Sequence, residues 1–320
     1  MSRRDDELMI SLATAGVFVW NRCSGTRTSL PPFHQLEVRA RFFPDDEGVL
    51  LLAGSSITSV ARLDRQGGLR WIAVEPCADV ALLSSQTGLT CRGQRIDFVA
   101  GTATPVAFPD GVAVSADGSL VATSSAVFAT ATAKAAFSLD LTGHEPIVLG
   151  FSPDLTTLAS VGEEGRLVLF DVATGLVRAV VPGCKAAALA FSPDGHLVAG
   201  GDGARVRLWS RDGRDLGGLV ATGTTQDVRA LWFVDKRLLV ADFGDQSLVI
   251  FDVNRKVALA SLSFYDRGRW MATGPDGVWE GDPDLGPASS YRRGWLVAAL
   301  RGYSPTEPTR SISASGRSSW

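Results

Sequence analysis

"FSPDGHLVAGGDGARVRLWS", residues 191–210, contains three short apolar runs separated by two polar turns. "SPDG" is typical of a turn, because proline presets φ, aspartate can bond its own backbone and glycine accepts a positive φ. "GGDGA" has the composition of a tight hairpin turn, and "RVRLW" alternates polar and apolar residues as a half-buried strand does. The stretch therefore predicts three short antiparallel strands joined by two turns.

The same pattern recurs along the chain. Phe151 begins "FSPDLTTLASVGEEGRLVLFD" and Phe233 begins "FVDKRLLVADFGDQSLVIFD", so that Phe170, Trp209 and Phe251 take the same place near the end of each copy. A period of about 40 residues is typical of solenoids and propellers. Upstream, residues 42–56 and 113–125 fit the same pattern, and residues 72–90 fit it loosely. The total is therefore six copies.

The repeated unit is made of β-strands. No window of about 12 residues after residue 30 shows a convincing helical period. Four short strands form one twisted blade, and radial packing of blades buries both faces of each sheet. The sequence therefore predicts an all-β chain that forms a single β-propeller.

Residues 142–175, "TGHEPIVLGFSPDLTTLASVGEEGRLVLFDVATG", resemble a WD-repeat. They have Gly-His before the first strand, Phe-Ser-Pro-Asp after it and an aromatic-Asp pair closing the third strand. The resemblance covers roughly residues 8–262 and implies a WD-repeat β-propeller. It also implies structural roles for one set of residues: His34, His144, Phe170, Trp209, Phe251 and Trp20.

The copies depart from the family pattern in several places. Trp209 is followed by Ser210 instead of Asp, and Cys184 takes the histidine position of the fifth copy. The buried Asp-His-Ser/Thr-Trp hydrogen-bond network of the family is therefore expected to be incomplete in every blade. We expect apolar packing to hold the blades together.

Closure of the ring is predicted from the two ends of the propeller region. Residues 7–25 match the second half of a blade, with Trp20–Asn21 in the Trp-Asp place, and residues 263–302 supply further strands. As in WD-repeat propellers generally, the termini are expected to share one blade, which removes a free sheet edge. Six copies plus this shared blade predict seven blades of four antiparallel strands over residues 1–302. The Ser- and Pro-rich residues 303–320 are predicted to be a flexible tail.

A second resemblance lies in "RWMATGPDGVWEGDP", residues 269–283. It is similar to a Trp…Thr-Pro-Asp-Gly-aromatic segment that ends bacterial WD-repeat regions, some of them linked to caspase-like or other signalling and defence modules. Gly274 interrupts the Thr-Pro pair. The resemblance implies a bacterial origin and a protease-like or signalling partner.

Composition limits the classes of partner. The 320 residues carry a net charge of −3 with a pI near 5.7, which argues against a bulk electrostatic grip on nucleic acid or on an anionic membrane. "MSRRDDELM" lacks the apolar core of a signal peptide, and no apolar run approaches the roughly 20 residues that span a bilayer. Cys23, Cys77, Cys91 and Cys184 form no CxxC pair. These features predict a cytoplasmic protein with free thiols.

Candidate residues for chemistry are few. The chain has three histidines, no GxSxG motif, and glycine-rich turns that join strands instead of opening a helix. His196 follows "SPDG" and is expected to be a solvated turn residue. "LDRQGGLRW" (63–71) resembles a quinoprotein docking motif but occurs once. We therefore predict no catalytic residue, cofactor or metal, although a propeller enzyme of the hydrolase or lactonase type, with a site in the central channel, is kept as an alternative.

The leading functional hypothesis is a non-catalytic protein–protein interaction scaffold or sensor subunit. Loops at one end of a propeller project side chains toward one area, where a protein or peptide can bind. Most of the candidate side chains are acidic, which predicts a basic partner segment, although acidic turns can also serve solubility alone. The candidates on these loops are Glu145, Glu163, Glu164, Asp202, Arg205, Gln226, Asp227, Asp242 and Asp245.

Overall fold

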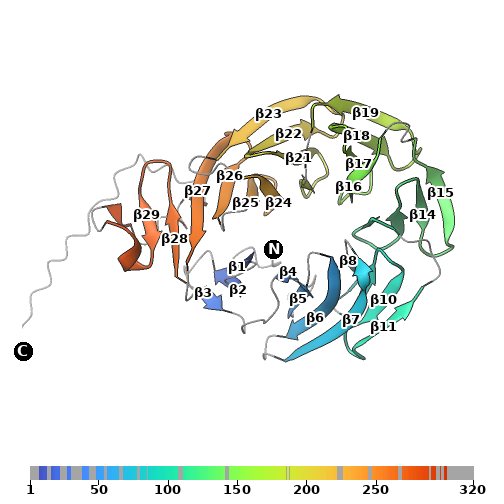
Figure 1. Cartoon of the computed structure of the whole chain (residues 1–320), viewed down its shortest axis with the longest axis horizontal. Coiled ribbons are helices and arrows are strands. Elements are labelled where there is room, and N and C mark those ends of the chain that lie inside the picture. Colours follow the sequence, from blue (N-terminus) through green and yellow to red (C-terminus); the bar gives the residue numbers. More distant parts are fainter. Residues whose placement is uncertain are drawn as a thin grey trace, which may run out of the picture.

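The chain folds into a β-propeller whose sheets stand radially around the centre of the molecule, with β7, β15, β19 and β23 at the outer rim (Figure 1). In this computed structural model, side chains are described from residue 48 onward and only the backbone before it. The described residues run from 7 to 300, except for 13–15, 22–26, 30–37, 43–47, 54–55, 65–67, 78–79, 85, 107–110, 141–143, 185, 187, 222–225, 244–246, 266–268, 288–289, 293–295 and 297–298.

Six blades follow one another in chain order, and in each of them four antiparallel strands pair with their sequence neighbours. Blades one to three consist of β4 (Val38–Phe42), β5 (Gly48–Ala53), β6 (Ile57–Asp64) and β7 (Leu69–Cys77), then β8 (Val80–Leu82), β9 (Thr87–Thr90), β10 (Gln94–Asp97) and β11 (Thr102–Pro105), then β12 (Ala113–Val114), β13 (Leu120–Ala122), β14 (Ala126–Ala129) and β15 (Lys134–Ser138).

Blades four to six contain the clearest sequence repeats. They consist of β16 (Pro146–Phe151), β17 (Thr157–Gly162), β18 (Arg166–Asp171) and β19 (Val177–Pro182), then β20 (Leu189–Phe191), β21 (Leu197–Asp202), β22 (Arg205–Ser210) and β23 (Asp215–Val220), then β24 (Val228–Phe233), β25 (Leu238–Phe243), β26 (Ser247–Asp252) and β27 (Val257–Phe264). The turns predicted within residues 191–210 join β20 to β21 and β21 to β22, as expected.

The prediction of seven blades, with the two termini sharing the last one, is wrong. At the N-terminus, β1 (Glu7–Leu12), β2 (Gly16–Asn21) and β3 (Arg27–Ser29) form a sheet of three strands only, and β1 lies against β4. The C-terminal strands β28 (Trp270–Thr273) and β29 (Trp279–Gly281) instead extend the sheet of blade six. The propeller has six blades, and among the described residues no strand of the predicted C-terminal segment (263–302) pairs with a strand of the predicted N-terminal segment (7–25).

A local pairing explains this outcome. β28 runs back antiparallel along β27, with Phe264 opposite Trp270, so the connecting segment is short. Closing a short connection costs less conformational entropy than pairing strands from opposite ends of the chain. The C-terminal strands therefore pair with the strand that immediately precedes them.

The loosely matched second copy forms a regular blade, but its boundaries differ from those of the pattern. Residues 72–77 belong to β7 of blade one, and blade two begins only at Val80. Its strands are three or four residues long, shorter than the six-residue strands β17 and β18 of blade four. Short strands give few alternating positions, which is why the repeat is weak there.

Apolar side chains fill the space between successive blades. Phe170, Trp209 and Phe251 are fully buried at equivalent places on β18, β22 and β26. Trp209 packs with Leu167 and Leu169 of the preceding blade. The described polar contacts between blades lie mainly in turns. The packing between blades therefore comes mainly from these apolar side chains.

Blade six is also apolar on its second face. Alternating residues of β25 pack on opposite sides, with Leu239 in the layer shared with blade five and Leu238 in the layer on the far side. Leu296 and Leu300, from the helical end of the described chain, complete that far layer. Arg237 links this segment to blade six, because its guanidinium donates to the carbonyl of Leu300 and to Asp252 Oδ2 (3.0 Å).

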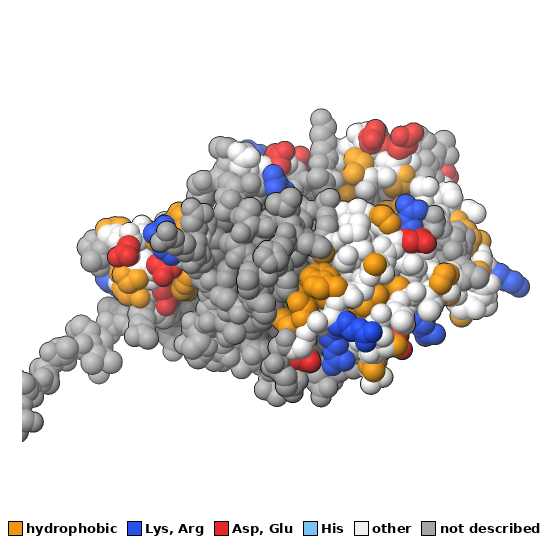
Figure 2. All heavy atoms as spheres, turned by 60° about the horizontal axis from the view of Figure 1, so that its bottom comes forward, with side chains coloured by type: hydrophobic (Ala, Val, Ile, Leu, Met, Phe, Trp, Pro, Cys, Tyr) orange, Lys and Arg blue, Asp and Glu red, His pale blue; other side chains and the backbone are white. Residues whose placement is uncertain are grey.

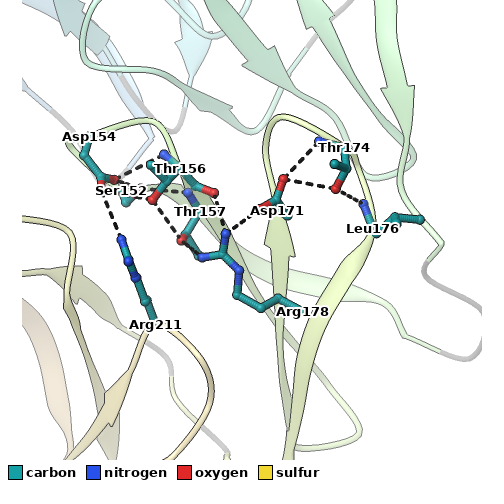
Figure 3. A network of polar contacts seen from close by, with 9 residues as sticks. All are labelled: Ser152, Asp154, Thr156, Thr157, Asp171, Thr174, Leu176, Arg178 and Arg211. Carbon is teal, nitrogen blue, oxygen red and sulfur yellow. Dashed lines mark hydrogen bonds and ion pairs between the residues drawn. The ribbon is translucent and has the colours of Figure 1, made fainter.

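A serine–aspartate turn joins the first two strands in blades three, four and five. In blade four, Ser152 donates to Asp154 (2.6 Å) and accepts from the backbone N–H of Thr157 (2.9 Å), as Figure 3 shows. Asp154 also faces Arg211 of blade five at 3.9 Å. Ser192 and Asp194 repeat the turn in blade five, where Asp194 lies 3.4 Å from Lys236 of blade six. In blades four and five, the turn therefore also contacts the following blade.

Replacing Gly195 with alanine should destabilise the fold by about 1–3 kcal/mol. Gly195 has φ +71°, and an added β-carbon would lie 2.5 Å from Asp154 Cγ across the blade boundary. The measurement is urea unfolding followed by circular dichroism. Gly150→Ala on β16 is the matched control, because no atom lies within 4 Å of its added β-carbon. Equal midpoints for the two variants would contradict the expectation.

Candidate protein-interaction face

The turns between second and third strands and the loops leading into first strands meet on one side of the propeller, here called the loop face. The backbone N–H of Cys184, ahead of blade five, donates to the carbonyl of Gly165 in blade four (2.8 Å). In the same way Val228, at the start of blade six, donates to Gly203 in blade five (2.9 Å). Main-chain bonds between blades therefore fix these loops in place.

Two of the predicted acidic residues lie together on blade four. Glu145 precedes β16 and Glu163 occupies the turn after β17, and both are exposed. The backbone N–H of Glu163 donates to the carbonyl of Glu145 (3.2 Å). The loop face thus presents two carboxylates side by side at this point.

Glu164 has a different environment, because its carboxylate is engaged within the blade. It accepts from His144 Nδ1, and Arg166 Nε lies 3.2 Å away. Partial burial opposes ionisation, but hydrogen bonds from its own backbone N–H and from His144, together with Arg166, outweigh it, and the pKa of Glu164 lies below its ordinary value. Its charge is therefore partly neutralised by its neighbours.

His144 is buried and hydrogen-bonded through both ring nitrogens. Nε2 lies 2.8 Å from Ser160 Oγ on β17, and Nδ1 meets Glu164. Serine, histidine and a carboxylate are the members of a hydrolytic triad, but such a nucleophile must reach its substrate, and Ser160 is fully buried. The arrangement favours the structural role implied for His144, namely fastening the entering loop to the second strand.

A second group of candidates lies where blades five and six meet. Asp202 and Arg205 are opposite each other at the ends of β21 and β22, and Asp227 Oδ1 approaches Gly203 in the turn between them. Arg205, Gln226 and Asp227 are exposed, whereas Asp202 is half-buried. The structure therefore brings these four residues into one cluster, next to the pair on blade four.

The other candidates are spread differently. Asp242 lies half-buried near the end of β25, and Asp245 lies outside the described residues. His34 and the side chain of Trp20 also lie outside them, although the backbone of Trp20 pairs with Leu8 in the N-terminal sheet. The loop face is thus defined by the described candidates on blades four to six.

Blade five has a glycine where blade four has the serine that contacts His144. Gly200 takes the place that Ser160 has in blade four, since each lies opposite the equivalent leucine of the first strand. A β-carbon on Gly200 would lie 2.9 Å from Trp209 Cζ3, so the indole fills the space of the missing side chain. Trp209 Nε1 is buried and finds no hydrogen-bond partner among the described residues.

Sequence reasoning missed two features of this region. Arg92 and Arg95 are exposed at the turn between β9 and β10 of blade two, whose repeat is weak. Ile147 (52% exposed) and Arg229 are exposed on β16 and β24, the first strands of blades four and six. A register taken from the period-2 pattern places these strands but does not show which of their side chains a neighbouring blade leaves uncovered.

Charge is therefore distributed unevenly over the molecule. Figure 2 brings the rim of blades one and two forward and shows basic side chains gathered beside hydrophobic ones on that side. Arg70 and Arg95 are exposed there, as are Leu69 and Val99. The described candidates on the loop face of blades four to six, by contrast, are mostly acidic.

Two further findings concern metal sites and membrane-spanning helices among the described residues. No group of three or more His, Cys, Asp or Glu side chains in that part of the chain could hold a metal ion. Within the same residues, no helix has the length and apolar character needed to cross a membrane.

Comparisons with known proteins agree with the fold. Residues 179–210 match the family described as WD domain, G-beta repeat, so the expected WD-repeat resemblance is confirmed. No curated protein matches the chain in sequence. The crystal structure of the Myceliophteria thermophila Cps50 (Swd1) β-propeller domain is similar, with a TM-score of 0.62, 14% identity, and coverage of 77% of this chain and 92% of that one. The chain thus has the fold of a WD40 β-propeller.

Replacing Glu164 with glutamine should lower the free energy of unfolding at neutral pH, and the difference from the unsubstituted protein should shrink as the pH falls from about 5 to about 3. The folded-state pKa lies below the ordinary value of 4.5. The charge therefore stabilises the fold above pH 4.5, and that contribution is lost as the pH falls through the folded-state pKa. Urea unfolding at several pH values measures it.

Glu163→Gln is the control, because it removes the same charge from the same turn outside the His144 network. If the two variants lost the same free energy of unfolding at every pH, the contact between Glu164 and His144 would not stabilise the fold.

Proposed function

We propose that this chain is a non-catalytic protein-interaction scaffold or sensor subunit that binds a basic segment of a partner protein on its loop face. The WD40 propeller fold commonly mediates protein–protein interactions. The observation that carries the proposal is the grouping of acidic side chains on loops joined by main-chain hydrogen bonds, of which Glu145, Glu163 and Asp227 are exposed and Asp202 is half-buried.

Rigidity of the loops supports this use of the face. Ordering of loops and side chains on association is one of the main costs of binding. The bonds from Cys184 to Gly165 and from Val228 to Gly203 order the loop face in the free protein. A partner segment then meets a surface that is already arranged.

An apolar anchor lies beside the acidic groups. Ile147 is half exposed on β16, two residues after Glu145. Interfaces concentrate their energy in apolar or aromatic anchors that surrounding contacts shield from water. We therefore expect the partner segment to place an apolar side chain on Ile147 and its basic side chains on the surrounding carboxylates.

The setting is also part of the proposal. The likeness of residues 269–283 to the segment that ends bacterial WD-repeat regions supports a bacterial signalling or defence assembly, with a protease-like or signalling module as the partner. Cys184 is a buried free thiol, which supports a reducing compartment such as the cytoplasm.

Reversing charge on the loop face should abolish partner capture. The variant Glu145→Lys, Asp202→Lys, Asp227→Lys replaces three carboxylates, and like charges placed against a basic segment oppose binding. Tagged protein is purified under mild conditions from the native host, and co-purifying proteins are quantified by mass spectrometry. We expect at least one abundant protein that is lost with the variant and with raised salt.

The control is Asp212→Lys, which places lysine on an exposed turn between β22 and β23, away from the loop face. This control should retain the partner. Recovery of free protein alone, or equal loss of the partner from both variants, would overturn the proposal.

A further inference from the structure

The outer strand β19 of blade four is an exposed apolar sheet edge. In the sheet order β16-β17-β18-β19, β19 pairs with β18 on one side, and no described strand pairs with the other. Val177 is 43% exposed and Val180 is 51% exposed, and Leu176, just before the strand, is 68% exposed. Ala179 and Val181 turn inward to the layer shared with blade five. Such an edge can accept a further strand.

Most other outer strands carry features that discourage pairing. β7 has Arg70, Glu75 and Pro76 exposed, and β15 begins with the exposed Lys134. β11 has four residues and ends in proline. β23 carries Asp215 and two successive glycines. Charges, proline, glycine and short length are the usual means by which sheet edges are protected.

The remaining outer strand shows how this fold covers an apolar edge. β27, "VALASLSF", is the rim strand of blade six, and the chain's own β28 pairs with it from Ser261 to Phe264. β19, "VRAVVP", is the comparable apolar strand, but the described chain places no strand beside it.

The charge on β19 is neutralised within the blade. Arg178, the one charged residue of the strand, points to Asp171 (2.5 Å) and to Thr157 Oγ1 (2.9 Å), as Figure 3 shows. Hydrogen bonds from Arg178 and from Thr174 hold the pKa of Asp171 below its ordinary value, so that the pair stays ionised. Two copies of β19 can therefore meet without placing like charges opposite each other.

We propose that β19 pairs antiparallel with β19 of a second copy of this chain, forming a two-fold dimer through the rim of blade four. A two-fold contact uses the same surface on both subunits, which requires a self-complementary strand. The edge meets this condition, because its one charged side chain is paired within the blade and exposed valines lie along it. A six-residue edge buries less surface than a standard interface, so the dimer is weak.

Analytical ultracentrifugation of the full chain from about 5 to about 200 µM tests the proposal in the range where a small interface assembles. We expect the weight-average mass to rise from that of the monomer toward that of the dimer. Val180→Lys should weaken association at least about tenfold, because it adds a positive charge to both of the paired edges, and like charges across paired strands repel. Circular dichroism checks that the variant folds.

Val220→Lys is the matched control, since Val220 is 59% exposed on the rim strand β23. It should leave the dimer unchanged, and hydrogen exchange should show concentration-dependent protection of residues 177–182. A monomer at every concentration would overturn the proposal. So would a dimer that Val180→Lys leaves intact, or one that the two lysine variants weaken equally. None of these results depends on the partner proposed for the loop face.

Discussion

The fold depends on one constraint, which is that the sheet of each blade is apolar on both faces and both faces must be covered. Alternating residues of β25 show it directly, because Leu239 packs toward blade five and Leu238 packs toward the opposite side. For interior blades the next sheet supplies the cover. On the far side of blade six, Leu296 and Leu300 are the described residues from outside the sheet that join this layer, and Arg237 donates a hydrogen bond to the carbonyl of Leu300. The C-terminal segment thus contributes to the core of blade six.

Within that constraint, neighbouring blades use different chemistry at equivalent positions. Blade four joins its loop to its second strand through Ser160, His144 and Glu164. Blade five has glycine in place of the serine, and the ring of Trp209 occupies the vacated volume. Apolar layers contribute in proportion to the surface they bury, whereas a hydrogen bond contributes a net gain of about 1 kcal/mol. Loss of the polar network is therefore tolerated as long as the layer stays filled.

The sequence predicted local features well and the closure of the ring poorly. Turn residues such as those in 192–195 and the alternation in 205–209 act over a few positions, and the structure follows them. Residues 270–281 could pair with the nearby β27 or with the distant N-terminal sheet. An alternating pattern of apolar residues does not distinguish between these two partners. The same limit applies to the site. Turn composition was enough to propose Asp202 and Asp227 as candidates, but exposure of Ile147 and Arg229 depends on how completely adjacent blades cover them.

The geometry also separates two kinds of surface. Loop-face residues are joined across blade boundaries by backbone bonds such as that from Val228 to Gly203. The rim strand β19 instead ends its sheet, and no described strand pairs with its outer edge. A partner bound at the loop face and a second copy paired at the rim of blade four would occupy different parts of the propeller. A dimer built this way would carry two loop faces, so a partner with two basic segments would gain avidity from a high effective concentration, without a stronger contact at either face.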